Sequence, residues 1–137
     1  MSGLEIIGAF ATIVSVLQAW KASGRSTKSL KAQGMRDLSA AVAKTKQVIA
    51  ERSGKPPFPD VVQAWEKASI SMAEAKQKGL SHLCRIKSLY WLNPLEWSDE
   101  EVYAAGIQLT AMERELRRLL ASESKPQKKN SSGRAAG

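Results

Sequence analysis

The sequence predicts an all-α protein: a four-helix bundle followed by a basic, disordered C-terminal tail. Apolar residues recur every three to five positions along four long segments, and no segment alternates as a strand would. Proline, glycine and serine clusters separate these segments. The 137-residue chain, 43% hydrophobic and 25% charged, is long enough for one buried core. We therefore expect a bundle over residues 1–122 and a tail over residues 123–137.

The first predicted helix, Gly3 to Ala22, is apolar around most of its circumference. No charged residue occurs from Ile6 to Trp20. This stretch would span roughly 22 Å as a helix, which is short of the ~30 Å hydrocarbon core of a membrane. We expect a central bundle helix at rest, and tilted or oligomeric insertion into a thinned bilayer stays open.

The second and third helices are predicted on either side of a proline-rich break. The second starts at Ser26 or Lys28 and runs to Glu51, where "RSGKPPFPD" ends it because proline cannot continue a helix. The third is expected from Val61 to Leu83, with Asp60 as its N-cap.

The fourth predicted helix follows an irregular stretch, "CRIKSLYWLNPLEW", that turns at Asn93 and Pro94. The sequence "SDEE" fits a capping box, in which Ser98 is the N-cap and Glu101 lies three residues further on. We expect this helix to reach about Ser122.

The residues that catalysis or metal binding needs are scarce. Cys84 is the only cysteine and His82 the only histidine. Two residues apart on one helix, their side chains do not face each other. One histidine and one cysteine also cannot build a tetrahedral zinc site. We expect a buried, inert thiol, no enzyme, no cofactor and no metal.

A formal net charge of +8 favours polyanionic partners, either nucleic acid or anionic lipid. Lys21, Arg25, Lys28 and Lys31 directly follow the apolar helix. Such a cluster can bind lipid headgroups at about 1 kcal/mol per basic group, although a solvated helix face explains it equally well. Trp20 suits an interface anchor or a core edge. Since only Glu5 precedes the apolar run, we expect no secretory signal, a cytoplasmic protein, and peripheral membrane binding on activation.

Two stretches resemble a known group of helical domains. "SGLEIIGAFATIVSVLQAW" is similar to the opening helix of fungal HeLo-type domains. "AEAKQKGLSHLCRIKSLYWL" is similar to the end of the third helix in a wider group, which includes the four-helix bundles of mixed lineage kinase-like pseudokinases and the helical domains of plant immune receptors. In this second stretch the matching residues are Ala75, Lys76, Cys84, Lys87, Ser88, Leu89, Tyr90 and Leu92.

The resemblance implies a cell-death or immune-signalling domain that oligomerises and attacks membranes with its first helix. It implies a homo-oligomer in the active state, triggered for instance by an upstream protein partner. The residues expected to enter the membrane are Ile6, Ile7, Phe10, Ile13, Val14, Leu17 and Trp20.

Two alternatives stay open at the sequence level. The first is a non-enzymatic helical adaptor that docks a partner through Tyr90, Trp91 and Trp97, residue types typical of interface anchors. The second is a small basic nucleic-acid-binding protein that uses the second helix and the tail. Lipid binding that depends on the first helix would favour the membrane hypothesis, whereas salt-dependent binding through the tail would favour nucleic acid.

Overall fold

The structure, a computed structural model, describes residues 3–20, 28–85 and 87–124. These residues form α-helices and short 3₁₀ helices and contain no strand, so the all-α prediction is confirmed for this part of the chain. The α-helices are α1 (Gly3–Ala19), α2 (Lys28–Glu51), α3 (Pro59–Glu74), α4 (Lys78–Cys84) and α5 (Asp99–Ser124). The 3₁₀ helices η1 (Lys87–Trp91) and η2 (Pro94–Glu96) lie between α4 and α5. Almost all of the predicted tail lies outside the described residues.

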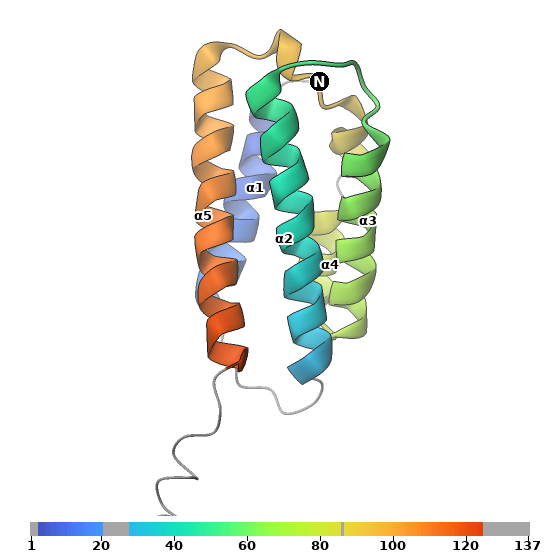
Figure 1. Cartoon of the computed structure of the whole chain (residues 1–137), viewed down its shortest axis with the longest axis vertical. Helices are drawn as coiled ribbons and strands as arrows, with labels where there is room; N and C mark the ends of the chain where they lie inside the picture. Colours follow the sequence, from blue (N-terminus) through green and yellow to red (C-terminus); the bar gives the residue numbers. More distant parts are fainter. Residues whose placement is uncertain (1–2, 21–27, 86, 125–137) are drawn as a thin grey trace, which may run out of the picture.

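The helices run along one common axis, as Figure 1 shows. Helices α1, α3 and α5 point in one direction, and α2 and α4 point in the other. Helix α2 packs between α3 and α5, α1 packs chiefly against α5, and α4 folds back along α3. The parallel pair α1 and α5 is joined near its C-terminal ends, where the Arg118 guanidinium donates to the Leu17 carbonyl at 3.4 Å.

The predicted third helix is wrong, because the segment from Val61 to Leu83 is two helices. Lys76 adopts a left-handed backbone conformation with φ +65°. The amide of Gln77 donates to the Met72 carbonyl at 2.8 Å, and that of Lys76 to the Ala73 carbonyl at 3.0 Å. This pair of bonds is a Schellman motif, which ends α3 and turns the chain back into α4.

Side-chain bonds hold α4 against α3. The Ser69 hydroxyl donates to the Ser81 carbonyl at 2.9 Å, and the Ser81 hydroxyl donates to the Ser69 carbonyl at 2.8 Å. The Arg85 Nε group also donates to the Ser69 hydroxyl at 2.9 Å. These bonds between α3 and α4 stabilise the two-helix arrangement. The spacing of apolar residues along the sequence does not predict such tertiary bonds.

The observed ends of α2, α3 and α5 can be compared with the predicted helix ends and caps. Helix α2 ends at Glu51, as predicted. Helix α3 begins at Pro59, a favourable first position, so Asp60 lies in the first turn and is not the N-cap. The capping box is confirmed, since the Glu101 amide donates to the Ser98 hydroxyl at 3.1 Å and the Ser98 amide donates to the Glu101 carboxylate at 2.9 Å.

Trp65 occupies the centre of the core and joins three helices. Its ring stacks on Phe10 of α1 with 5.9 Å between ring centroids. Its Nε1 group donates to the Thr45 hydroxyl of α2 at 2.8 Å, and that hydroxyl donates to the Ala41 carbonyl at 2.7 Å. The one polar atom of the indole is therefore bonded inside an apolar core, as a buried tryptophan requires.

Candidate functional site

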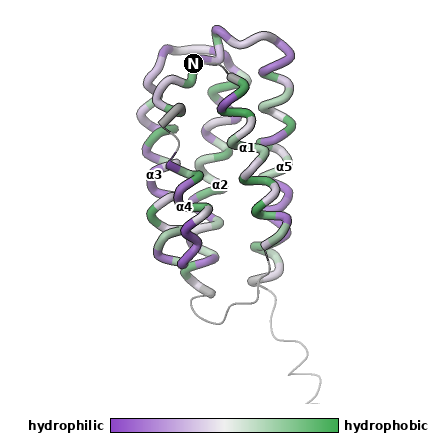
Figure 2. Tube along the Cα trace, turned by 180° about the vertical axis from the view of Figure 1, so that it is seen from behind, coloured by the Kyte–Doolittle hydropathy of each residue, from purple (hydrophilic) through white to green (hydrophobic). Residues whose placement is uncertain are grey.

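Helix α1 buries most of the residues that were expected to enter a membrane. The buried residues are Ile6, Phe10, Ile13, Val14 and Leu17. Ile7 and Trp20 are partly buried and pack against the same core. Figure 2 shows that hydrophobic residues dominate the whole length of α1, whereas hydrophilic segments recur along α3 and α4. In this state α1 is a core helix, in agreement with the expectation for the resting protein.

The exposed face of α1 is nearly uncharged. The residues that face outward include Leu4, Gly8, Thr12 and Ser15. From Leu4 to Trp20 the one charged residue is Glu5. The Thr12 hydroxyl donates to the Gly8 carbonyl at 3.0 Å and the Ser15 hydroxyl to the Ala11 carbonyl at 3.3 Å, so both hydroxyls are satisfied within the helix. Across the described residues, no helix combines the length and the apolar character that a membrane crossing requires.

One end of the bundle is basic. The C-terminal ends of α1, α3 and α5 meet the start of α2 and of α4 at the lower end of Figure 1. The exposed cations of these segments are Arg36, Lys76, Lys78, Arg117 and Arg118. Two acids belong to the same segments: Glu74 ends α3, and Glu115 forms an ion pair with Arg118 at 2.8 Å. The opposite end carries the cations Arg52 and Lys55 but a larger number of carboxylates, those of Glu5, Glu51, Asp60, Glu96, Asp99, Glu100 and Glu101. The bundle is therefore an electric dipole along its long axis.

The predicted headgroup residues lie only in part within the described chain. Lys21 and Arg25 lie outside it, and so does the side chain of Lys28, which begins α2 at the basic end. Lys31 is buried, with 7% of its surface exposed, and is not accessible to a headgroup in this state. Sequence reasoning missed Lys76 and Lys78, because it placed them inside one continuous helix.

The predicted partner-interface residues divide into two exposed aromatics and one core residue. Trp91 is 66% exposed and Tyr90 is 46% exposed, whereas Trp97 is buried in the core cluster. Trp97 therefore does not form part of an accessible surface in this state. Tyr90 and Trp91 line a notch of about 340 Å³ together with Pro56 and Pro57.

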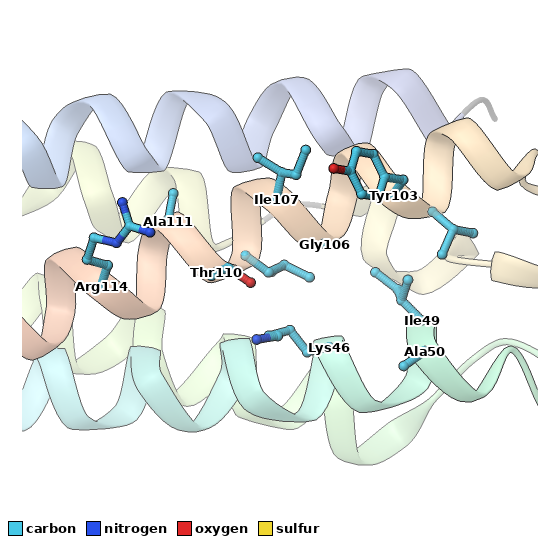
Figure 3. Close-up of a pocket in the computed structure, with 11 residues that line it drawn as sticks. Lys46, Ile49, Ala50, Tyr103, Gly106, Ile107, Thr110, Ala111 and Arg114 are labelled. Carbon is cyan, nitrogen blue, oxygen red and sulfur yellow. The ribbon is translucent and has the colours of Figure 1, made fainter.

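A groove of about 570 Å³ lies between α2 and α5 (Figure 3). Its floor is mainly apolar, formed by Ile49, Gly106 and Leu109 among others. Tyr103 on its edge is 73% exposed. The Lys46 ammonium and the Glu113 carboxylate form an ion pair at 2.7 Å between the two helices. Sequence reasoning missed this groove, since the pattern marked only the buried seam of the last helix.

Cys84 is buried, as predicted, and desolvation raises the pKa of its thiol to about 12. The thiol is therefore neutral at physiological pH and a poor nucleophile. His82 is exposed, so the two side chains do not share one environment. Among the described residues, no three histidine, cysteine or carboxylate groups gather as metal ligands would.

Comparisons of the chain with protein-family models, with curated proteins and with solved structures found no match. The resemblance to HeLo-type and related domains stays a prediction.

Proposed function

We propose that this chain is a membrane-targeting, oligomerising helical-bundle domain of the cell-death or immune-signalling type. The four long helices α1, α2, α3 and α5 would form the bundle, with α4, η1 and η2 as the return connection. The basic end docks on an anionic lipid surface, and α1 then acts as the membrane effector.

The observation that carries this proposal is the position of the cations relative to α1. Exposed basic residues from α2, α5 and the turn between α3 and α4 belong to the end of the bundle at which α1 finishes. Arg118 is paired with Glu115, so it is left out of the sum. At about 1 kcal/mol per basic group near an anionic surface, Lys76, Lys78 and Arg117 together supply on the order of 3 kcal/mol. Because carboxylates outnumber cations at the far end, the dipole orients the bundle with the end of α1 toward the lipid.

The composition of α1 supports the effector role. Its one charged residue, Glu5, lies in the first turn, and both of its described hydroxyls are bonded to the helix backbone. Hydroxyls satisfied in this way add little to the cost of moving a helix into lipid, whereas a charged group at the centre of a membrane costs about 3 kcal/mol on insertion scales.

The docking step is tested by flotation with phosphatidylcholine vesicles, with and without phosphatidylserine. We expect binding only with phosphatidylserine, and at least a hundredfold weaker binding for the double variant Lys78→Glu, Arg117→Glu. The matched control, Lys44→Glu with Lys55→Glu, makes the same charge change on exposed residues away from the basic end. Equal loss in both variants would show a net-charge effect and refute oriented docking.

The effector step is tested by dye release from the same vesicles. Thr12→Glu places a charge on the exposed face of α1, so the bundle keeps its core, which circular dichroism verifies. We expect normal docking but strongly reduced release, while Gln63→Glu on the exposed face of α3 leaves release unchanged. Release by Thr12→Glu at the wild-type rate would refute α1 as the effector.

The adaptor function is the second candidate, and the exposed aromatic notch favours it. Trp91, Tyr90 and the half-exposed Leu95 leave apolar surface at the end of the bundle opposite the basic one. A variant with Trp91→Ala and Leu95→Ala that still docks and releases dye, yet loses signalling in cells, would assign this end to a protein partner.

A further inference from the structure

The outward face of α5 carries exposed apolar residues between two opposite charges. Glu100, Tyr103, Ile107, Ala111 and Arg114 follow one another at steps of three or four residues. At 100° per residue these positions fall within about 80° of one another. They face away from the buried seam of α5, which is formed by Ala105, Leu109, Met112, Leu116 and Leu119.

This face is accessible and apolar at its centre. Tyr103 is 73% exposed and Ile107 is 49% exposed, and both border the groove between α2 and α5 (Figure 3). Next to these large side chains the groove presents small residues, Gly106, Ala111 and Ala50. Large residues beside small ones on one surface allow close packing of a second helix.

The charges on this face are arranged symmetrically about Ile107. Glu100 lies seven residues before Ile107 and Arg114 lies seven residues after it, so each charge is about 10 Å from Ile107 along the helix axis. Both are exposed, and within the described part of the chain neither forms an ion pair. A face with this pattern is complementary to itself when two copies meet with their α5 helices antiparallel.

We infer that the α5 face binds a second copy of this chain in an antiparallel, two-fold symmetric dimer centred on Ile107. In this arrangement Glu100 of each copy faces Arg114 of the other. Tyr103 of each copy lies opposite the small residue Ala111 of the other. Such isologous pairing is the commonest way in which soluble proteins form dimers.

The inference rests on the proposed function in one respect: it identifies the surface through which the proposed oligomerisation would take place. It does not use the basic end or α1. Dimerisation in solution and docking on vesicles are therefore measured independently, and either can fail alone.

Sedimentation equilibrium with single and combined charge reversals tests the dimer. Glu100→Arg or Arg114→Glu alone turns two attractive pairs into two repulsive ones, so we expect the dimer to weaken roughly tenfold or more. An equimolar mixture of the two single variants should form a heterodimer, because the arginine introduced in one copy then faces the glutamate introduced in the other. The double variant Glu100→Arg, Arg114→Glu should dimerise like wild type.

Controls separate a specific face from a general effect of charge. Lys44→Glu and Glu66→Arg make equal charge changes at exposed sites away from this face and should leave dimerisation unchanged. Ile107→Lys should weaken the dimer at least hundredfold without loss of thermal stability, since Ile107 lies outside the core. Wild-type protein that stays monomeric at every concentration, or single variants that dimerise normally, would overturn the inference. The inference would also be overturned if the control variants weakened the dimer as much as the Glu100 and Arg114 variants do.

Discussion

Arg52 joins the end of α2 to the start of α5, and its removal is the most informative stability test. Its guanidinium donates to the Trp97 carbonyl at 2.6 Å and to the Asp99 carboxylate at 2.7 Å. A longer bond, at 3.4 Å, reaches the Pro94 carbonyl. Arg52 makes these contacts from a left-handed backbone conformation with φ 49°. A non-glycine residue in this conformation costs on the order of 1 kcal/mol.

The free-energy change of Arg52→Ala follows from these contacts taken singly. The Asp99 side chain is 95% exposed, so this ion pair contributes at most about 1 kcal/mol. The short bond to the Trp97 carbonyl is charge-assisted and partly buried, which is worth about 1.5 kcal/mol or more. The 3.4 Å bond adds little. Arg52→Ala should therefore destabilise the protein by about 2.5 kcal/mol, which lowers Tm by about 10 °C for a chain of this length.

Thermal and urea unfolding of three further variants separates the contributions. Asp99→Ala removes only the exposed partner and should cost less than about 1 kcal/mol. Arg52→Gly loses the same bonds as Arg52→Ala but relieves the left-handed backbone, so it should be about 1 kcal/mol more stable than Arg52→Ala. Arg52→Lys should not restore wild-type stability, because a single ammonium cannot reproduce the forked geometry. The reasoning is refuted if Arg52→Ala and Asp99→Ala cost the same, or if glycine is worse than alanine at this position.

The remaining predictions concern three other positions. Lys76→Gly should stabilise the protein by about 1 kcal/mol, since glycine suits the left-handed end of α3, and a lower Tm would contradict the Schellman assignment. Ser98→Ala should cost about 1 kcal/mol and Ser98→Gly only a few tenths, measured by urea unfolding. The Cys84 thiol should stay unreactive toward a thiol reagent at pH 8 until the chain is unfolded. Because burial raises the pKa of Cys84 from 9.0 to about 12, the unfolded chain loses the proton first as pH rises above 9. Stability should therefore fall from about pH 9 toward about 12, and Cys84→Ala should remove that slope.

Local sequence signals predicted some helix ends well and others poorly. The end of α2 at Glu51 and the capping box of Ser98 and Glu101 depend on neighbouring residues alone, and both agree with the structure. The break between α3 and α4 depends on a lysine in a left-handed conformation and on bonds between Ser69 and Ser81. No glycine marks that position, so periodicity continued across it.

The surfaces of the candidate site needed the topology as well as the sequence. The basic end exists because antiparallel helices bring the start of α2, the turn at Lys76 and the end of α5 to one place. The sequence identified the basic cluster from Lys21 to Lys31, but could not show that Arg117 lies at the same end of the bundle as the start of α2. The burial of Lys31 and Trp97 likewise follows from packing, since an amphipathic pattern leaves their depth undetermined.

The burial of α1 sets the free energy that is needed to release this helix from the bundle. Ile6, Phe10, Ile13, Val14 and Leu17 are all buried, and at about 2 kcal/mol for each side chain their exposure to water would cost on the order of 10 kcal/mol. That cost is comparable to the whole stability of a domain of this size, and it corresponds to roughly one molecule in ten million with α1 released. Release into water is therefore negligible, whereas release into a bilayer returns most of the cost because the same side chains are buried again. The proposed effector step thus requires lipid to be in contact first, so mutations of the basic end should abolish dye release even where α1 is unchanged. Dye release that persists after the basic end has been neutralised would separate the two steps and refute this order of events.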